Sequence, residues 1–224
     1  TPSGKQTFDA VQAFGPRAIA EAARGAGLSG ITHISAIGAN AASASAYART
    51  KAAGEAGVLE TLPDSIIIRP SIVFGPEDNF FNQFADMARF APALPLIGGG
   101  QTKFQPVYVC DVAEAVARAV DGKLTPGAVY ELGGPEVKTF RQCLEDMLLV
   151  TRRSRSLVPV PFPVASMIAR ILQRLPGAPL TVDQVELLKS DNVVSEVAIS
   201  EGRTLEGIGI KPATLATIRP TYLD

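Results

Sequence analysis

The stretch Ser65-Ile-Ile-Ile-Arg-Pro-Ser-Ile-Val-Phe74 decides the fold class, because it is almost continuously apolar where an exposed strand would alternate. Such runs are typical of strands that are covered on both faces of a sheet. A shorter apolar run at residues 31–37 predicts another buried strand, and residues 43–62 between the two runs predict a helix. This alternation predicts an α/β fold with a layered parallel sheet.

Elements on both sides of this core continue the alternation. Helices are predicted over residues 8–24, 80–90, 111–120 and 139–150, and strands over 104–109 and 128–132. Asp111 is the expected N-cap of its helix, and Gly98-Gly99-Gly100 is expected to form a flexible loop. A Pro-punctuated segment at 157–163 precedes an apolar helical stripe from Val164 to Leu175. Residues 176–179 are expected to separate this helix from short helical pieces over 181–223.

Composition excludes several classes of function. The chain has 224 residues, of which 46% are hydrophobic, so it can bury a real core. A net charge of -1 gives no general field that would gather nucleic acid. Cys110 and Cys143 are the only cysteines and form no Cys-x-x-Cys pair, so we expect neither a disulfide framework nor a metal site. Apolar runs fall short of the about 20 residues of a spanning helix, which favours a cytoplasmic protein that is soluble or peripheral.

Three residues form a candidate catalytic constellation. Tyr47 and Lys51 stand four residues apart on a predicted helix, and Ser35 closes the preceding strand. Residues at i and i+4 share a helix face, here toward the edge of the sheet where open α/β folds bind ligands. A nearby ammonium would lower the pKa of the Tyr47 phenol, and Ser35 would hydrogen-bond a substrate carbonyl. The alternative is an ordinary exposed Tyr and Lys pair.

The surrounding motifs resemble the extended short-chain dehydrogenase/reductase superfamily. They are Ile31-Thr-His-Ile-Ser35, Tyr47-Ala-Arg-Thr-Lys51 with Glu55 four residues on, and Ile68-Arg-Pro-Ser-Ile-Val-Phe-Gly-Pro76. Downstream, Glu77-Asp-Asn-Phe-Phe-Asn-Gln-Phe-Ala, Pro95-Leu-Ile and Gln105-Pro-Val-Tyr-Val-Cys-Asp-Val-Ala113 are similar to its atypical branch, which includes the NAD(P)-binding accessory subunit of respiratory complex I.

This resemblance implies roles for particular residues. Tyr47 and Lys51 would contact the ribose of NAD or NADP, and Arg69, Pro70 and Ser71 would line the nicotinamide. It also implies a partial Rossmann-like domain over residues 1–151, with a substrate-side insertion at about 76–109 and a helical lobe over 152–224. The Gly-rich phosphate-binding turn of the family does not stand upstream of Ser35. At about 30 residues per strand-helix-strand unit, we therefore expect a missing N-terminal half or a partner chain that supplies it.

Three hypotheses follow from these residues. In the first, the chain is a complex I accessory-type protein whose dinucleotide stabilises the structure. In the second, it is an active reductase or nucleotide-sugar epimerase that uses Ser35, Tyr47 and Lys51. In the third, it is a cofactor-free interaction module. The third hypothesis places docking in residues 157–180, and this segment is a candidate for contact with complex I subunits or a membrane surface. His33, the only histidine, is expected to pack in or near the core.

Overall fold

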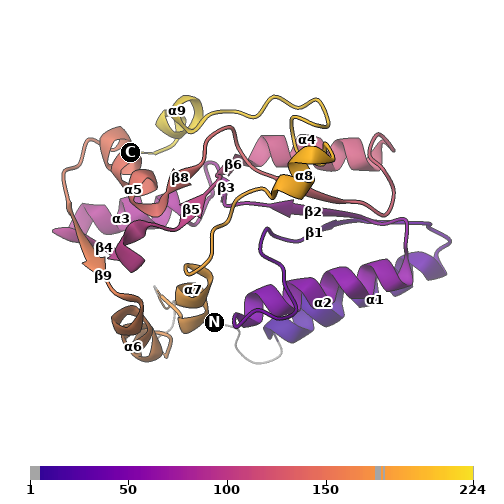
Figure 1. Ribbon diagram of the computed structural model, residues 1–224, viewed down its shortest axis with the longest axis horizontal. Helices are drawn as coiled ribbons and strands as arrows, with labels where there is room; N and C mark the ends of the chain where they lie inside the picture. Colours follow the sequence, from indigo (N-terminus) through magenta and orange to yellow (C-terminus); the bar gives the residue numbers. More distant parts are fainter. Residues whose placement is uncertain (1–5, 175–177, 179, 224) are drawn as a thin grey trace. The chain divides into compact units, whose positions relative to one another are not determined.

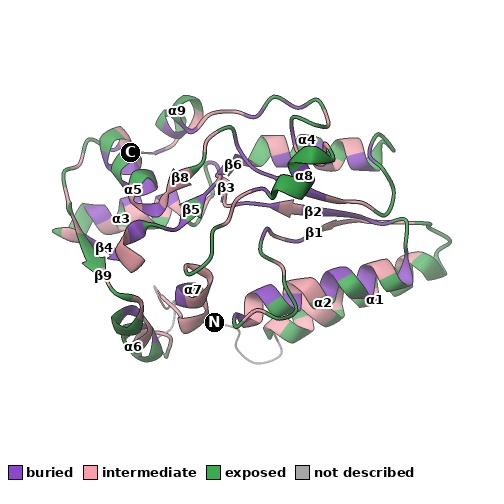
Figure 2. Cartoon of the chain, in the orientation of Figure 1, coloured by how far each residue is buried: buried purple, intermediate pink, exposed green. Residues whose placement is uncertain are grey.

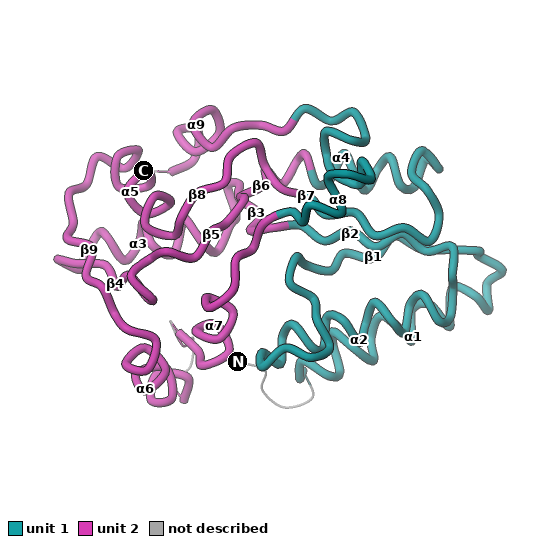
Figure 3. Tube along the Cα trace, in the orientation of Figure 1, with its two compact units in different colours: residues 1–70, 112–132, 194–211 teal, residues 71–111, 133–193, 212–224 magenta. Residues whose placement is uncertain are grey.

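A computed structural model describes residues 6–174, 178 and 180–223. Its strands pair in parallel in three of the four small sheets, which confirms the α/β fold class. The chain divides into two compact units, drawn in different colours in Figure 3. The first unit takes in the described residues of 1–70, 112–132 and 194–211, and the second takes in those of 71–111, 133–193 and 212–224. The units thus interleave along the chain, and the expected domain boundary at residues 151 and 152 stays a prediction.

The first unit is built on a three-stranded parallel sheet with the order β1-β2-β7. These strands are β1 (Thr32–Ile34), β2 (Ile66–Pro70) and β7 (Val129–Leu132). The helices of this unit are the π-helix η1 (Asp9–Phe14), α1 (Gly15–Gly25), α2 (Ala46–Thr61), most of α4 (Val109–Val120) and α8 (Glu196–Ser200) (Figure 1).

Helices α1 and α2 pack together beside this sheet through small and aliphatic side chains. Ala20, Val58, Leu62 and Ile67 form a buried cluster between the helices and β2. At Gly54 of α2, an added Cβ would lie 2.1 Å from the main-chain oxygen of Gln12, so only glycine permits this close approach of η1. Ser45 caps α2 by accepting a hydrogen bond from the main-chain N–H of Ala48.

The second unit consists of two-stranded sheets and helices around one large apolar core. Its strands are β3 (Val73–Phe74), β4 (Ala93–Ile97), β5 (Lys103–Phe104), β6 (Val107–Tyr108), β8 (Lys138–Thr139) and β9 (Ser156–Val160). Its helical segments are α3 (Phe81–Phe90), η2 (Gly98–Gly100), α5 (Phe140–Val150), α6 (Phe162–Leu172), α7 (Val182–Leu187), α9 (Leu215–Ile218) and η3 (Arg219–Thr221).

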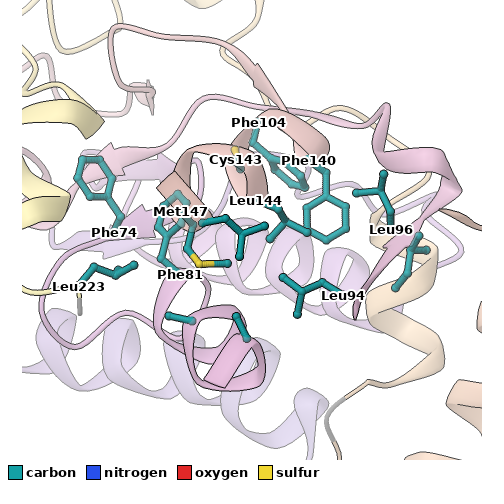
Figure 4. Packing of buried hydrophobic residues seen from close by; sticks show 14 of the residues in the cluster. Phe74, Phe81, Leu94, Leu96, Phe104, Phe140, Cys143, Leu144, Met147 and Leu223 are labelled. Carbon is teal, nitrogen blue, oxygen red and sulfur yellow. The ribbon is translucent and has the colours of Figure 1, made fainter. Parts of the chain in front are cut away.

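The core of the second unit gathers side chains from distant segments. Figure 4 shows Phe74, Phe81, Leu94, Phe140 and Leu144 packed together with other buried residues. Helix α5 enters this core through a capping box, in which Thr139 and Gln142 satisfy each other's main-chain N–H groups. The start of α5 therefore follows a local signal in the sequence.

Two of the predicted strands were wrong in their extent. The predicted strand at 65–74 divides into β2 and β3, which belong to different sheets, because the chain bends at Ser71 and Ile72. The predicted strand at 104–109 divides into β5 and β6, and Pro106, which has no N–H to donate, lies in the gap between them. Strand β1 is also less buried than predicted, since about half of the Ile34 side chain is exposed.

Smaller corrections concern a helix start, a loop and a strand pair. Helix α4 begins at Val109, so Asp111 lies in its first turn rather than at its N-cap, and its Oδ2 accepts a hydrogen bond from the Ala213 N–H at 2.8 Å. Gly98–Gly100 form a 3₁₀ turn in which all three φ angles are positive. The parallel pair of β4 and β9 was not predicted.

Two further observations concern the predicted helical lobe. Helix α6 confirms the predicted apolar helix up to Leu172, whereas Leu175 and the separator at 176–179, apart from residue 178, lie outside the described residues. Among the residues that the structure describes, no helix has the length and apolar character needed to cross a membrane.

Candidate functional site

The candidate site lies where β1 ends and α2 begins, within the first unit. Ser35 directly follows β1, and its main-chain N–H donates to the carbonyl oxygen of Ile68 on β2 at 2.7 Å. Tyr47 is the second residue of α2, and Lys51 follows one turn later on the same face. The structure therefore places these three predicted residues at the carboxyl end of a parallel strand and the first turns of the next helix, the region where open α/β sheets bind ligands.

Lys51 is held by the strand as well as by its own helix. Its Nζ donates to the main-chain oxygen of Ile34 at 3.2 Å and lies 5.9 Å from the centroid of the Tyr47 ring. The ring of Phe8 meets the Tyr47 ring edge-on, with the centroids 6.1 Å apart. Both side chains are half-buried, so each has a fixed position without being closed off from solvent.

The expected effect of Lys51 on the Tyr47 phenol is wrong for this structure. Burial raises the pKa of Tyr47 above its ordinary value, because removal from water penalises the phenolate. Burial also lowers the pKa of Lys51, and the neighbouring carboxylate of Glu55 opposes that shift. The phenol is therefore protonated at neutral pH, and it can donate a hydrogen bond but is a poor base.

Two polar atoms near this region lack a hydrogen-bond partner among the described residues. They are Ser35 Oγ and His33 Nε2, both of which are buried. A buried polar atom without a partner costs about 1–3 kcal/mol, so its presence favours a ligand that would satisfy it. His33 lies on β1, and its pKa is lowered by burial and by the positive charge of Lys51. His33 is only half-buried as a residue, although its Nε2 is enclosed.

Arg69 lies within a network of carboxylates. Its Nε and Nη2 donate to the two oxygens of Glu55 at 2.8 and 2.5 Å, and its Nη1 lies 3.6 Å from Glu131 Oε1. The hydrogen bond to Glu55 is the main cause that raises the pKa of Arg69. Glu131 Oε2 in turn accepts the main-chain N–H of Ser195, the N-cap of α8. The guanidinium thus joins α2, β2 and β7, and its predicted contact with a nicotinamide stays a prediction.

Pro70 and Ser71 have separate surroundings. The main-chain oxygen of Pro70 accepts the N–H of Ile37 at 3.0 Å, which extends the pairing beyond β1. Ser71 belongs to the second unit, where its Oγ lies 2.9 Å from the main-chain oxygen and 2.7 Å from Oδ1 of Asn192. The N–H of Gln105 donates to the same Oγ at 3.2 Å. Both residues therefore have structural bonds, and their predicted contact with a cofactor is untested.

Sequence reasoning overlooked the acidic residues of this region. Glu55 stands four residues after Lys51, so the helical period already placed it on the same face. Glu131 carries no comparable local signal, because only the pairing of β7 with β2 brings it opposite Arg69. The spacing of the sequence could thus have predicted the position of Glu55 but not that of Glu131.

A cavity of about 530 Å³ lies elsewhere in the first unit. Its lining includes Arg118, Tyr130 and Arg203, with none of Ser35, Tyr47 and Lys51. Arg118 bonds Glu114 and Arg203 Nη1 bonds the main-chain oxygen of Val129, whereas Arg203 Nε is buried without a partner among the described residues. We assign the candidate site to the strand end because Ser35, Tyr47 and Lys51 lie there and not in this cavity.

Comparison with protein families and curated proteins places the chain among known relatives. The family described as the RmlD substrate binding domain matches residues 38–162, more than half of the chain. The chain is 39% identical over 176 residues to subunit 9 of the NADH dehydrogenase [ubiquinone] 1 alpha subcomplex of Arabidopsis thaliana, which covers 74% of this chain and 44% of that protein. The corresponding subunit of Rattus norvegicus is 36% identical over 202 residues, or 89% of this chain and 52% of that protein. The chain thus spans about half the length of these mitochondrial relatives.

Solved structures confirm the fold. The dTDP-glucose 4,6-dehydratase DesIV of Streptomyces venezuelae, with NAD and TYD bound, has a TM-score of 0.69 at 17% identity, covering 99% of this chain and 67% of that one. A dTDP-4-dehydrorhamnose reductase of Bacillus anthracis, in complex with NADP, has a TM-score of 0.57 at 18% identity, covering 67% of this chain and 57% of that one. At these identities the likeness establishes the arrangement of elements and nothing about substrate.

Proposed function

The chain belongs to the family described as the RmlD substrate binding domain, and from this premise we propose that it is a nicotinamide-dinucleotide-binding protein of the complex I accessory type. In this proposal the bound NAD or NADP stabilises the structure more than it turns over. The curated relatives are named as mitochondrial NADH dehydrogenase subunits, which supports the complex I accessory type. The solved structures with NAD or NADP bound support the class of cofactor.

The observation that carries the proposal is the group of Ser35, Tyr47 and Lys51 at the end of β1. Lys51 has three N–H bonds and uses one on Ile34, so its ammonium can also hold ribose hydroxyls. The Ser35 Oγ, which has no partner among the described residues, offers a further hydrogen bond to a ligand, and Tyr47 lies on the same helix face as Lys51. These donor groups fit a nicotinamide riboside. When NADH or NADPH is bound, its reduced nicotinamide supplies a transferable hydride.

The state of Tyr47 fits both binding and turnover. A phenol whose pKa is raised keeps its proton at neutral pH, so it can donate a hydrogen bond to a ribose hydroxyl or a proton to a carbonyl that is being reduced. The second candidate function is a working reductase or nucleotide-sugar epimerase. It is favoured by the presence of all three residues of the constellation and by the likeness to sugar-nucleotide enzymes.

The finer partner assignments rest on the relatives. We infer that the protein associates with complex I subunits and that it is cytoplasmic and peripheral on the inner membrane. The names of the relatives, which are NADH dehydrogenase subunits of mitochondria, support the association with complex I and not the cytoplasmic location.

A titration tests the dinucleotide site directly. NADH or NADPH is added to the protein, and binding is followed by the change in nicotinamide fluorescence. We expect Lys51→Met to weaken the affinity by about tenfold, the value of one lost charge-assisted hydrogen bond. Lys123→Met is the matched control, because Lys123 is exposed and pairs only with Asp121 among the described residues. Absence of dinucleotide binding would favour the cofactor-free interaction module.

A turnover assay separates the proposed accessory protein from the working reductase or epimerase. Sugar-nucleotide and other carbonyl substrates are supplied at saturation, and oxidation of the reduced nicotinamide is followed by absorbance. The proposal expects no turnover on the enzymatic timescale. Turnover that disappears in Tyr47→Phe would replace the proposal with the working reductase.

A further inference from the structure

Helix α6 directs its small side chains inward and its large apolar side chains outward. Ala165 and Ala169 are buried in the core of the second unit, and Phe162 packs against that core. Met167 and Ile171, by contrast, are 61% and 63% exposed, and Val164 and Ile168 are also exposed. The spacing of three and four residues places these four on one face of the helix, which we call the outer face. In Figure 2 much of α6 is coloured as exposed.

The outer face is not needed for the packing of α6. The helix contacts α7 of the same unit, and the core beneath it includes Val185 of α7. Large apolar side chains that stay exposed while alanines fill the core mark an interaction surface. The fully buried residues of α6 are alanines, and Phe162 and Leu172 are only partly exposed, whereas Val164, Met167, Ile168 and Ile171 are exposed.

The charge around α6 indicates what covers this face. Arg170 and Arg174 are the only charged residues in the sequence from 161 to 182. The neighbouring helix α7 carries Asp183 and Glu186. Arg170 lies in the last turn of α6 and Arg174 lies two residues beyond its end; both are exposed, so they form a basic flank at the C-terminal end of the outer face. A helix with an apolar face and a basic flank is typical of segments that lie in the interface of an anionic membrane.

We propose that the outer face of α6 docks on the surface of an anionic lipid bilayer. Val164, Met167, Ile168 and Ile171 enter the boundary between headgroups and acyl chains, and Arg170 and Arg174 lie against lipid phosphates. The helix has 11 residues, so it lies along the surface and does not cross the bilayer. Helix α6 would be the surface through which the peripheral protein of the proposed function contacts the membrane. Membrane binding through α6 does not depend on dinucleotide binding.

Vesicle co-sedimentation of the full chain tests the proposal. The probes are vesicles of phosphatidylcholine alone and of phosphatidylcholine mixed with phosphatidylglycerol. We expect binding to the mixed vesicles that weakens as salt is raised, with little binding to the neutral ones. The double variant Met167→Gln/Ile171→Gln is expected to bind at least about tenfold more weakly. Arg170→Gln and Arg174→Gln are each expected to weaken binding by about fivefold.

A matched variant controls for exposed apolar side chains in general. Val11→Gln/Ile19→Gln changes two side chains in the first unit that are 57% and 62% exposed, and we expect it to leave vesicle binding unchanged. Thermal unfolding of all variants should match that of the original protein, since none of the changed side chains is buried.

Several results would overturn the proposal. They are absence of binding to the mixed vesicles, binding that survives in Met167→Gln/Ile171→Gln, and an equal loss in the control variant. A dimer that this α6 variant dissociates in the absence of lipid would assign the outer face to a second copy of the chain. Titration of the same variants with NADH distinguishes failure of membrane docking from failure of dinucleotide binding. A variant that loses vesicle binding but keeps its affinity for NADH is affected only at α6.

Discussion

The interiors of the two compact units differ in their apolar cores. The second unit has a large buried cluster rich in aromatic rings, in which Phe80, Phe81, Phe84, Phe104 and Phe140 meet mostly edge-on or tilted. The first unit has small apolar clusters, and an ion-paired guanidinium joins its sheet to its helix. Apolar burial is non-directional, whereas charged hydrogen bonds fix geometry. Each unit also has an ion-paired guanidinium: Arg69 in the first unit, and in the second Arg219, which is 4% exposed and lies 3.3 Å from Asp146 Oδ2. The units therefore differ mainly in the size of their apolar cores.

The largest effect is expected from the aromatic core of the second unit. Phe81→Ala removes a fully buried ring and should lower the free energy of unfolding by about 3–5 kcal/mol. Phe90→Ala in the same helix is the control, because that ring is 90% exposed and its loss should change stability by at most about 0.5 kcal/mol. Urea denaturation measures both. Similar losses in the two variants would contradict an apolar origin of this unit's stability.

The ion-paired centre of the first unit should give the next largest effect. Glu55→Gln removes the carboxylate that holds the Arg69 guanidinium, and we expect a loss of about 2–3 kcal/mol in urea denaturation. Glu21→Gln breaks the exposed pair with Arg17 and should cost at most about 0.5 kcal/mol. If Glu55→Gln were as mild as this control, the network would not organise the unit.

One buried serine in each unit allows the effect of removing a single hydroxyl on stability to be compared. Ser35→Ala removes an oxygen without a partner among the described residues and should raise stability by about 1 kcal/mol. Ser71→Ala removes an oxygen that bonds Asn192 and Gln105 and should lower it by about 1–2 kcal/mol. Thermal unfolding of the two variants without ligand gives both signs. A loss of stability in Ser35→Ala would show that its hydroxyl has a partner in the free protein.

The smallest effect is the pH dependence that His33 contributes. Its pKa is lowered in the folded protein, so the unfolded chain binds a proton more readily than the folded one. Stability should therefore be full above about pH 6.5, the unfolded pKa, and should decrease as the pH falls from there toward the folded pKa. Urea denaturation between neutral and mildly acidic pH should show this decrease, and His33→Gln should reduce it. An unchanged pH profile in His33→Gln would contradict the assignment.

Helix positions were predicted well because their signals are local. The predicted helix at 43–62 became α2 with Ser45 as its cap, and the predicted helix at 139–150 became α5 with a capping box at Thr139. Strand extents were predicted less well. The bend at Ser71 coincides with a bond to Asn192, 121 residues later, and no local pattern reports such a contact. Strands β4 and β9 were not predicted. They contain Pro95 and Pro159, and each has one neighbour in a two-stranded sheet, where proline is tolerated.

The candidate site likewise has features that local spacing predicts and features that only distant contacts create. Spacing alone brought Tyr47 and Lys51 to one helix face and could have added Glu55, because the helical period is a property of the local chain. The raised pKa of Tyr47 and the partnerless hydroxyl of Ser35 depend on burial by distant segments. So does the bond of Lys51 to Ile34, which needs β1 beside α2.

The sequence by itself determined the α/β class, the order of the main helices and the identity of the candidate residues. These follow from periodicity, capping and motif spacing, each of which acts within a few turns or strands. Only the tertiary structure decided which strands pair, that Arg69 is bound by Glu55 and Glu131, and that α6 keeps its large apolar side chains exposed. The physical reason is that burial and ion pairing are set by residues far apart in the chain, and folding alone brings those residues together.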